Sequence, residues 1–237
     1  MLAISQPTYL PWIGYFSLID ASDEFVFLDD VQFDTRSWQQ RNRILINGNE
    51  KYLTLPVIKK GLSNQTISSA QIKNKKIFNE HLLNIKHAYS KAKFFEMYFK
   101  KLENIFSKCN EFKKLSEINI YLIKEISKII GLNCNFYKAS DLNCLGKKSK
   151  KLINICKKLN KKDYIINQGA KEYIEKDVNE FTNNEIKLFI IDNYEIKYNQ
   201  LAEVFYDKLS IVDVLLNYGP ETKSLVKNSY NISIFNK

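Results

Sequence analysis

The sequence contains few of the residues that usually form metal centres and acid–base catalysts. It has 2 histidines, and these, His81 and His87, do not share a helix face as the i,i+4 histidines of a zinc site do. The 4 cysteines match no CxxC spacing and form no small disulfide framework. We therefore expect structural or exposed histidines, buried reduced thiols and no histidine-based mechanism.

A long apolar run is also missing. After the first eighteen residues, no uninterrupted apolar stretch reaches the roughly eighteen residues that a membrane span needs. Those first residues lack a basic leader and contain two prolines, and Asp20 and Asp23 follow them without a small-residue cleavage site. We expect a cytoplasmic protein with no integral membrane segment.

The composition is that of a globular protein with a substantial core. The chain has 237 residues, of which 45% are hydrophobic, enough for one large domain or two small ones. Its formal net charge of +10 comes almost wholly from lysines and suits nucleic acid, an acidic membrane surface or a phosphorylated small molecule. No zinc-finger, homeodomain or RNA-recognition signature accompanies the charge, so nucleic acid is not an expected partner.

The rarer residue types gather near the beginning of the chain, within residues 2–43. This stretch holds both tryptophans and all the arginines, which are Trp12, Trp38, Arg36, Arg41 and Arg43. A guanidinium offers a planar fork of donors that matches carboxylate or phosphate, which lysine does not imitate. The arginines therefore favour an anion site. The alternative is a chance cluster that pairs on the surface with Asp29, Asp30 and Asp34.

The order of hydrophobic segments predicts an α/β fold. Buried-type strands are expected at residues 2–5, 24–28, 135–139, 164–166 and 187–191. Helical spacing between the first two strands makes a βαβ unit, which implies a parallel pair with a right-handed crossover. A further helix is expected at 149–159. We predict a Rossmann-like, mostly parallel sheet of about five strands.

Two units interrupt the alternation of strands and helices. Residues 43–58 are typical of a β-hairpin around the turn Asn47-Gly48, because both turn residues tolerate positive φ. Residues 76–131 have helical spacing throughout and end at Gly131, which suits a helix C-terminus. They predict a helical insertion or layer.

The end of the chain predicts a capped helix and then a tail. Ser210 and Asp213 have the spacing of a capping box, and Gly219-Pro220 ends the helix that follows. A structural role for Ser210 and Asp213 is therefore favoured over a catalytic one. We expect a single α/β domain over residues 1–227 and a tail over 228–237.

Polar residues at the ends of predicted strands indicate where a ligand binds. In parallel sheets, ligands bind beyond the carboxyl ends of the strands. Gln6 and Pro7 follow the first strand, and Asp29, Asp30 and Gln32 follow the second. The arginines come directly afterwards, which favours one shared site.

A second candidate position follows the strand at 164–166. Gln168, Gly169 and Lys171 open a short helix that contains Tyr173, and a helix N-terminus next to a glycine suits an anion or a carboxylate. An ordinary turn from strand to helix explains the same residues equally well.

Five segments between residue 2 and about residue 221 carry a resemblance to a known family: QPTYLPWIGYFSLIDASDEFVFLDDVQF, RSWQQRNRI, YIINQGAKEYI, YNQ at Tyr198 to Gln200, and LSIVDVLLNYGPE. They closely resemble the WbqC-like proteins of bacterial surface-polysaccharide gene clusters. Where this chain has Asn167-Gln168-Gly169, the family usually has a serine-glycine-proline type of sequence. The resemblance implies a part in making O-antigen of lipopolysaccharide, or a similar glycan, by modifying an amino sugar.

A more distant resemblance is to the nucleotidylyltransferase-like α/β fold. Trp12-Ile13-Gly14-Tyr15 occupies the place of that fold's HxGH motif, with both histidines replaced, which argues against adenylyl transfer by that mechanism. Gly14 permits close approach of a ligand, and Trp12 and Tyr15 suit stacking on a base or a sugar.

Three functions are consistent with these features. The first is a transferase that moves an acyl or aminoacyl group to the amine of a nucleotide-linked sugar. Asp29 or Asp30 would accept the amine proton, and Asn42 would orient the acceptor. Arg36 and Arg41 would hold the diphosphate. The second is an ATP-using nucleotidylyltransferase-like enzyme, and the third is a non-catalytic nucleotide-sugar binding protein.

The substrate site is expected to draw on the whole chain. The expected contact residues are Gln6, Pro7, Trp12, Gly14, Tyr15, Gln32, Arg36, Arg41, Arg43, Gln168, Gly169, Lys171, Tyr173, Tyr198 and Gln200. The cofactor is left open between ATP and an acyl or aminoacyl donor. Asp23, Asp29 and Asp30 suit Mg²⁺ with a diphosphate, although their spacing does not require a metal. The oligomeric state is open.

Overall fold

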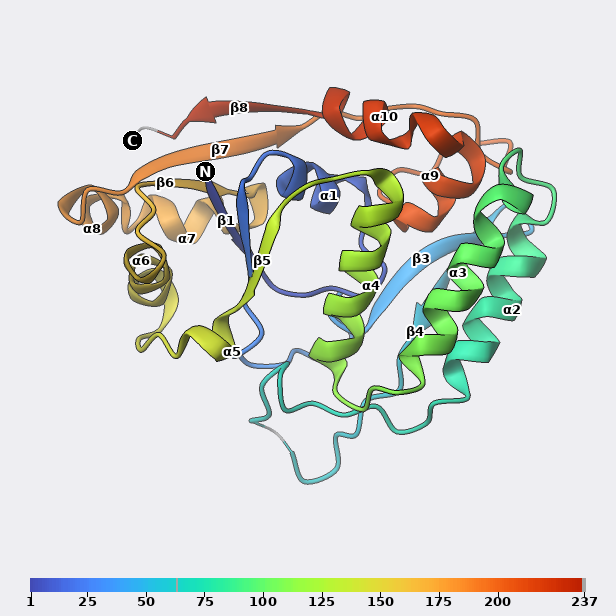
Figure 1. Cartoon of the computed structure of the whole chain (residues 1–237), viewed down its shortest axis with the longest axis horizontal. Coiled ribbons are helices and arrows are strands. Elements are labelled where there is room, and N and C mark those ends of the chain that lie inside the picture. The colour runs from blue at the N-terminus through green and yellow to red at the C-terminus, as the bar shows by residue number, and fades with distance from the viewer. Residues whose placement is uncertain (63, 236–237) are drawn as a thin grey trace.

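One sheet of six strands runs through the residues that the computed structural model describes, 1–62 and 64–235 (Figure 1). Its strands are β1 (Leu2–Ser5), β2 (Glu24–Phe27), β5 (Asn135–Lys138), β6 (Asp163–Ile166), β7 (Lys187–Asn193) and β8 (Tyr230–Ile234). The order across the sheet is β5-β2-β1-β6-β7-β8. The first five strands in this order are parallel, and β8 is antiparallel to β7. The prediction of a Rossmann-like, mostly parallel sheet is confirmed.

The strand order reverses at the middle of the sheet. The chain passes from β1 through α1 (Ile13–Asp20) to β2, and later adds β6 and β7 on the other side of β1. The crossovers to β6 and β7 contain α5 (Ala139–Leu142), α6 (Lys148–Lys158), η1 (Gln168–Ala170), α7 (Lys171–Glu175) and α8 (Val178–Asn183). Because adjacent connections leave in opposite directions, the carboxyl ends of β1 and β6 mark the position at which α/β sheets commonly bind ligands.

The sheet is buried on both faces, which explains why its strands are nearly continuous apolar runs. Side chains alternate along each strand, so Leu2 and Ile4 of β1 join one core with Val26 of β2. Ala3 and Phe25 face the other, larger core. The smaller core packs against α6 and α8, whereas the larger one includes side chains of α1 and of the helical layer.

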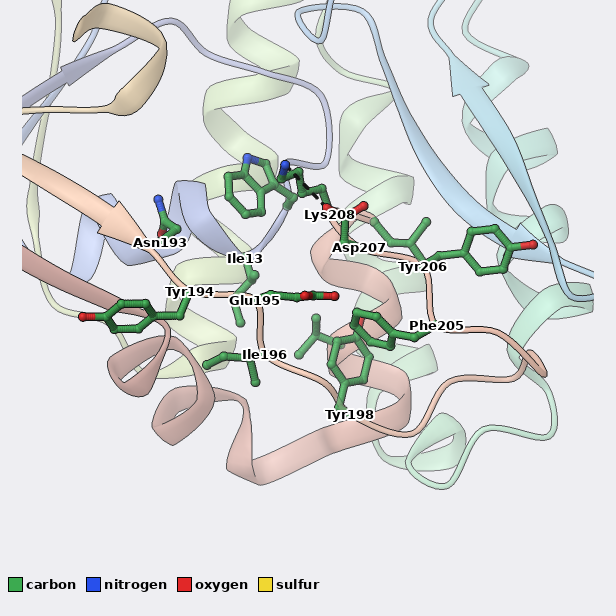
Figure 2. Close-up of a pocket in the computed structure, with 13 residues that line it drawn as sticks. Ile13, Asn193, Tyr194, Glu195, Ile196, Tyr198, Phe205, Tyr206, Asp207 and Lys208 are labelled. Carbon is green, nitrogen blue, oxygen red and sulfur yellow. Dashed lines mark ion pairs between the residues drawn. The ribbon is translucent and has the colours of Figure 1, made fainter.

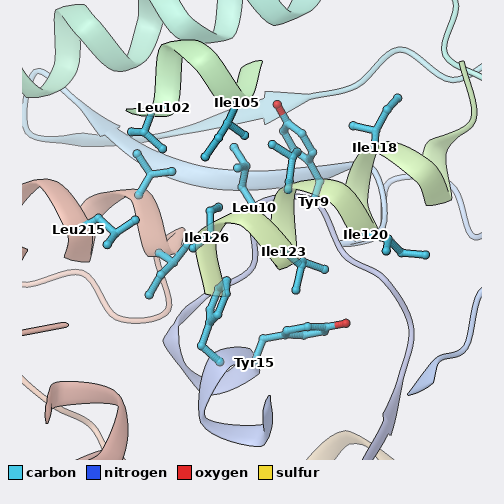
Figure 3. Packing of buried hydrophobic residues seen from close by; sticks show 14 of the residues in the cluster. Tyr9, Leu10, Tyr15, Leu102, Ile105, Ile118, Ile120, Ile123, Ile126 and Leu215 are labelled. Atoms are coloured by element: carbon cyan, nitrogen blue, oxygen red, sulfur yellow. The ribbon is translucent and has the colours of Figure 1, made fainter. Parts of the chain in front are cut away.

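The helical layer predicted for residues 76–131 consists of three helices. These are α2 (Ile77–Tyr89), α3 (Phe95–Cys109) and α4 (Leu115–Ile130). Gly131 follows α4 with φ +83°, the left-handed conformation that suits glycine after a helix. Figure 3 shows Ile118, Ile123 and Ile126 of α4 lying against Tyr9 and Leu10, which precede α1. The layer therefore supports the segment that leads from β1 into α1.

The predicted hairpin is present and begins two residues earlier than expected. It consists of β3 (Arg41–Ile46) and β4 (Asn49–Thr54), joined by Asn47 and Gly48, which have φ +52° and +72°. The two-residue turn sets the register and places Arg43 opposite Tyr52. Since side chains alternate along a strand, Arg41 and Arg43 share one face of the hairpin, while the buried Asn42 lies on the other.

The tail predicted over residues 228–237 is wrong for most of its length. Residues Tyr230–Ile234 form β8, paired with β7 from Asn193 opposite Tyr230 to Phe189 opposite Ile234. The strand follows α9 (Ile211–Tyr218), η2 (Gly219–Glu221) and α10 (Thr222–Asn228). The period-2 pattern of Tyr230, Ile232 and Ile234 was its signal in the sequence. Residues 236 and 237 lie outside the described part.

The histidines and cysteines have mostly the expected structural places. His81 is buried on α2 with its Nδ1 2.7 Å from the Tyr9 hydroxyl, and His87 is exposed. Burial lowers the pKa of His81 to about 4. Cys109 and Cys156 are buried thiols, while the other two cysteines are half-buried. Across the helices of residues 1–62 and 64–235, none has the length and apolar character needed to cross a bilayer.

Candidate functional site

Two adjoining pockets lie where the chain enters α1, at the carboxyl edge of the sheet. One, of about 200 Å³, is the loop pocket; its wall comes mainly from residues 194–209, here called the pocket loop (Figure 2). The other, of about 180 Å³, is the hairpin pocket. The hairpin pocket is lined by Thr8, Pro11, Trp12, Tyr15, Trp38, Asn42, Arg43 and Lys208. Trp12 and Lys208 line both pockets and therefore mark the junction between them.

The indole of Trp12 lies over the first turn of α1. A Cβ atom at Gly14 would come within 2.3 Å of the indole ring, so only glycine leaves room for Trp12 in this position. The close approach predicted at Gly14 is thus made by Trp12 and not by a ligand. Tyr15 is buried behind the hairpin pocket, and its hydroxyl donates to the carbonyl oxygen of Gln6 at 3.0 Å. The two aromatic side chains form a fixed wall.

Arg43 ties the hairpin to the pocket loop. Its Nη1 lies 2.6 Å from a carboxylate oxygen of Glu50, and its Nη2 is 3.4 Å from the carbonyl oxygen of Asp207. Its Nε is buried without a hydrogen-bond partner among residues 1–62 and 64–235. Arg43 therefore lines the hairpin pocket as a structural cation with one donor unused.

Glu195 is the open carboxylate of the loop pocket. Figure 2 shows its side chain reaching into the pocket, with Ile13, Tyr198 and Phe205 around it. Within the described part of the chain, Glu195 takes part in no ion pair and no side-chain hydrogen bond. Lys208 lines the same pocket and pairs with its neighbour Asp207 at 3.4 Å (Figure 2). The pocket thus contains a carboxylate, Glu195, and an ammonium group, Lys208, on a partly apolar surface.

A buried carboxylate, Asp213, anchors the pocket loop. It accepts hydrogen bonds from the hydroxyls of Tyr89 and Tyr198, both at 2.8 Å, and is fully buried. Burial raises the pKa of Asp213 above its usual range. Gln200 donates to the Tyr198 hydroxyl and exchanges two hydrogen bonds with the backbone of Tyr206. Tyr198 and Gln200, expected to contact substrate, therefore hold the shape of the loop.

The capping box predicted at Ser210 and Asp213 is only half formed. Ser210 caps α9 by accepting the backbone N–H of Val212 at 3.3 Å. The Asp213 carboxylate points instead to its two tyrosines, as described above. The structural role predicted for both residues agrees with these contacts.

The carboxylates after β2 already have partners. Asp29 is buried and accepts hydrogen bonds from the backbone N–H and the hydroxyl of Ser140, at 2.9 and 2.7 Å. Asp30 pairs with Lys151 at 2.5 Å. Neither aspartate lines the two pockets. The alternative prediction, that the arginines form surface ion pairs with Asp29 and Asp30, is not what the structure shows, because these carboxylates bond to Ser140 and Lys151.

The three aspartates proposed for Mg²⁺ do not meet. Asp23 precedes β2 and Asp29 follows it, so a strand of four residues, roughly 13 Å long, separates them. No group of three or more histidine, cysteine, aspartate or glutamate side chains that could hold a metal is found among residues 1–62 and 64–235. Asp23, Asp29 and Asp30 therefore do not form one Mg²⁺ site, and the metal requirement, which the sequence left open, is not assigned to them.

Asn42 has its amide group committed to the backbone. Its Nδ2 donates to the carbonyl oxygen of Leu10 at 2.7 Å, and its Oδ1 accepts the N–H of Arg43 at 2.8 Å. The residue is 3% exposed. Asn42 therefore connects β3 to the segment before α1, and these contacts use one of its two N–H donors and one lone pair of its Oδ1 while the residue lines the hairpin pocket.

The residues predicted after β6 form a separate group. The side chain of Asn167 accepts the N–H of Ala170 at 3.0 Å and so begins the helical turn. Gln168 donates to Asp192, while Lys171 and Tyr173 are exposed on α7. None of Gln168, Gly169, Lys171 and Tyr173 lines the two pockets. These contacts favour the ordinary turn from strand to helix.

The remaining predicted residues lie after β1 and β2 and line neither of the two pockets. Gln6 follows β1, and its Oε1 accepts a hydrogen bond from Gln39 at 2.9 Å. Pro7 is buried and accepts a hydrogen bond from Asn119. Gln32 and Arg36 lie exposed on the loop after β2.

Sequence comparison places the chain in a family. Residues 6–225 match the model of the WbqC-like protein family. The chain belongs to this family. A relative in Mycobacterium tuberculosis, uncharacterized protein Rv1507c, is 30% identical over 226 residues, which cover 95% of this chain and 97% of that protein. No solved structure matches significantly.

The matched region includes every residue that lines the two pockets of this WbqC-like protein. The resemblance stated from the sequence is confirmed. Glu195 and Lys208, however, were missed, because they lie in an irregular segment where no periodicity marks which side chains converge. The short spacing between Tyr198 and Asp213 gave no sign that the two would bond.

Proposed function

We propose that the protein is an enzyme of bacterial surface-glycan biosynthesis that transfers an acyl or aminoacyl group to the amine of a nucleotide-linked amino sugar. Membership of the WbqC-like family supports the glycan pathway. The main observation that supports the proposed reaction is that two different pockets meet at Trp12 and Lys208. Aromatic rings line both pockets, and the loop pocket also holds the carboxylate of Glu195, as a sugar ring and a reacting amine would require.

The hairpin pocket suits the sugar. Its walls include Trp12, Tyr15 and Trp38, and aromatic faces pack well against the C–H groups of a sugar ring. Its volume of about 180 Å³ is below the roughly 300–1,000 Å³ of pockets that enclose a drug-sized ligand. The pocket therefore fits one sugar ring rather than a whole nucleotide-sugar.

Glu195 is the group best placed to act as the base. As the amine nitrogen attacks the donor's carbonyl carbon, Glu195 accepts the amine proton; the N–C bond forms, and the bond to the leaving group breaks with its electron pair. Lys208, at the junction, supplies positive charge for the oxygen that becomes negative in the transition state. This assignment replaces the base predicted at Asp29 or Asp30, because both already bond to other side chains.

Binding can be tested by thermal shift with UDP-linked and dTDP-linked amino sugars, followed by mass spectrometry of each stabilising mixture. A ligand at a hundred times its dissociation constant should add about 2.7 kcal/mol to the free energy of unfolding. Stabilisation by ATP alone, with release of pyrophosphate, would support the nucleotidylyltransferase-like alternative instead. A nucleotide-sugar that binds and stays unchanged with every acyl and aminoacyl donor would support a binding protein.

The base is tested by comparing Glu195→Gln with Asp30→Asn. Glu195→Gln should lower turnover about 100-fold or more and leave nucleotide-sugar binding intact, since removing a general base typically costs this much. Asp30→Asn should keep turnover, because Asp30 pairs with Lys151 away from the pockets. The opposite result, with turnover lost only in Asp30→Asn, would return the base to the end of β2.

A further inference from the structure

An exposed pair of aromatic rings continues the hairpin pocket outwards. Trp38, which lines the pocket, and Tyr52 of β4 have ring centroids 6.3 Å apart and planes inclined by 36°. They are 48% and 50% exposed, although both are large and partly apolar. Contiguous exposed rings of this kind mark binding surfaces more often than single exposed residues do. We call Trp38 and Tyr52 the aromatic platform.

Two of the chain's three arginines lie against the platform. The guanidinium carbon of Arg41 is 4.4 Å from the Tyr52 ring centroid, and that of Arg43 is 5.6 Å from the Trp38 ring centroid. The hairpin produces this arrangement, because Arg41 and Arg43 share its outer face and the register sets Arg43 opposite Tyr52. Cations over rings in this range are attracted by the ring quadrupole.

The two arginines differ in how much of their hydrogen-bonding capacity is used. Arg43 is committed to Glu50 and the pocket loop. Arg41 has no ion pair and no side-chain hydrogen bond within the described residues, so its fork of donors faces solvent beside the platform. A ligand for this surface therefore needs a flat ring to stack and an anion to meet Arg41.

We propose that the aromatic platform and Arg41 bind the nucleoside diphosphate end of the nucleotide-linked sugar. The base stacks on Trp38 and Tyr52, the diphosphate accepts hydrogen bonds from Arg41, and the sugar enters the hairpin pocket. This inference rests on the proposed function. It also accounts for the small volume of the pocket, because the nucleotide lies outside it on the hairpin.

The platform is held in place before a ligand arrives. The carbonyl oxygen of Trp38 accepts the N–H of Tyr9 at 2.9 Å, and that of Gln39 accepts a hydrogen bond from Asn119 at 2.7 Å. Tyr52 is fixed by the register of the hairpin. These contacts fix the backbone that carries the two rings, and a preorganised backbone lowers the entropy lost when a small ligand binds.

Single-stranded nucleic acid uses the same chemistry of stacked bases and basic side chains. The platform offers only two rings, and it leads into a pocket closed by Trp12 and Tyr15. This geometry fits one base followed by a sugar and does not continue as a groove along a strand.

Binding is measured by quenching of Trp38 fluorescence with UDP, dTDP, ADP, inorganic pyrophosphate and a ten-residue oligouridine as probes. Trp38→Phe, in which Trp12 is the remaining tryptophan, supplies the background signal. We expect at least one nucleoside diphosphate to quench wild-type fluorescence and not that of Trp38→Phe, and to bind more tightly than pyrophosphate. Equal affinity for pyrophosphate, no quenching by any nucleoside diphosphate, or tighter binding of the oligonucleotide would each overturn the proposal.

Arg41→Gln tests the contact with the diphosphate. The affinity for the quenching nucleotide should fall about tenfold to a hundredfold, the range for hydrogen bonds to a charged group. Lys51→Gln is the matched control, since it removes one positive charge from the neighbouring position of β4, on the opposite face from Tyr52. Both side chains lie at the surface, so thermal unfolding should confirm that both variants fold. Equal affinity in the two variants would contradict the role of Arg41.

The same variants separate this inference from the proposed function. If the wild type acylates an amino-sugar nucleotide while Trp38→Ala and Arg41→Gln keep its KM, the platform is overturned and the function stands. If nucleoside diphosphates bind the platform but no donor is transferred, the function is overturned and the platform stands.

Discussion

The carboxyl edge of the sheet contains two regions of opposite character. After β2, Asp29 and Asp30 are bonded to Ser140 and Lys151. Beyond β7, Glu195 reaches into the loop pocket with no such partner among the described residues. Both regions place carboxylates where parallel sheets commonly bind ligands. A polar residue at a strand end thus becomes a candidate for chemistry only when the fold leaves it without a partner.

The largest effect is expected from removing the anchor of the pocket loop. Asp213→Ala should lower the free energy of unfolding by about 3 kcal/mol, because two buried tyrosine hydroxyls lose their acceptor. It should also abolish nucleotide-sugar binding by releasing the pocket loop. Urea unfolding and ligand titration measure the two effects.

Asp29→Ala is the matched variant on the other side of the sheet. It also removes a buried carboxylate that accepts two hydrogen bonds, so it should cost a similar free energy of unfolding. Ligand binding should survive, since Asp29 lines neither pocket. If Asp29→Ala and Asp213→Ala lose ligand binding to the same extent, the end of β2 and the pocket loop do not differ in their role in binding.

Acid should lower the free energy of unfolding of the protein through His81. Burial lowers the pKa of His81 to about 4 in the folded protein, against roughly 6.5 in the unfolded chain. Between these values the unfolded chain binds a proton that the folded protein does not, so the free energy of unfolding decreases as the pH falls. The difference amounts to roughly 3 kcal/mol by pH 4, at about 1.4 kcal/mol per pH unit.

Urea unfolding at pH 7 and pH 4.5 tests this prediction in the wild type and in His81→Gln. Carboxylates titrate in both proteins, so their contribution cancels in the comparison. The variant should lose less stability than the wild type on acidification. An identical loss in the two proteins would show that His81 does not carry this pH dependence.

The space around two glycines, Gly14 before the pockets and Gly169 after β6, differs in the same way. At Gly14 an added methyl group would meet the Trp12 indole at 2.3 Å, so Gly14→Ala should cost about 1–3 kcal/mol and displace Trp12 from the pocket junction. At Gly169 the nearest atom would be 3.4 Å away, so Gly169→Ala should change stability by about 0.5 kcal/mol or less. Thermal unfolding and tryptophan fluorescence compare the variants, and similar effects at both positions would contradict the fixed place of Trp12.

The parts of the fold that the sequence predicts are those set by local pattern. The five parallel strands and the helical layer follow from apolar periodicity, and the Asn47-Gly48 turn follows from residues that tolerate positive φ. The same turn sets the register that places Tyr52 opposite Arg43. The position of Tyr52, one of the two residues of the aromatic platform, therefore follows from the local sequence. The strand at Tyr230–Ile234 was missed because a five-residue alternation at the end of a chain is a weak signal.

The candidate site was less predictable because its contacts are distant in sequence. Asp29 meets Ser140, which lies 111 residues away, and Asp213 meets Tyr89 at a separation of 124. No local pattern reports such pairs, yet they decide which carboxylates are structural. The pocket loop that carries Glu195 follows the same rule, since its course depends on the distant Asp213 as well as on hydrogen bonds within the loop.

An effect on stability alone, without loss of turnover, is expected where the ion pair after β2 is broken. Lys151 and Asp30 have side chains that are only 12% and 21% exposed, so Lys151→Gln should cost about 1–3 kcal/mol of stability, because it leaves a largely buried carboxylate without its cation. Turnover should not change.

Lys208→Gln reverses this pattern, because Lys208 is 60% exposed and paired only with its neighbour Asp207, yet it lies at the junction of the two pockets. Its loss should leave thermal unfolding nearly unchanged and lower turnover; a Lys151→Gln variant that lost more turnover than Lys208→Gln would place the reacting groups at the end of β2.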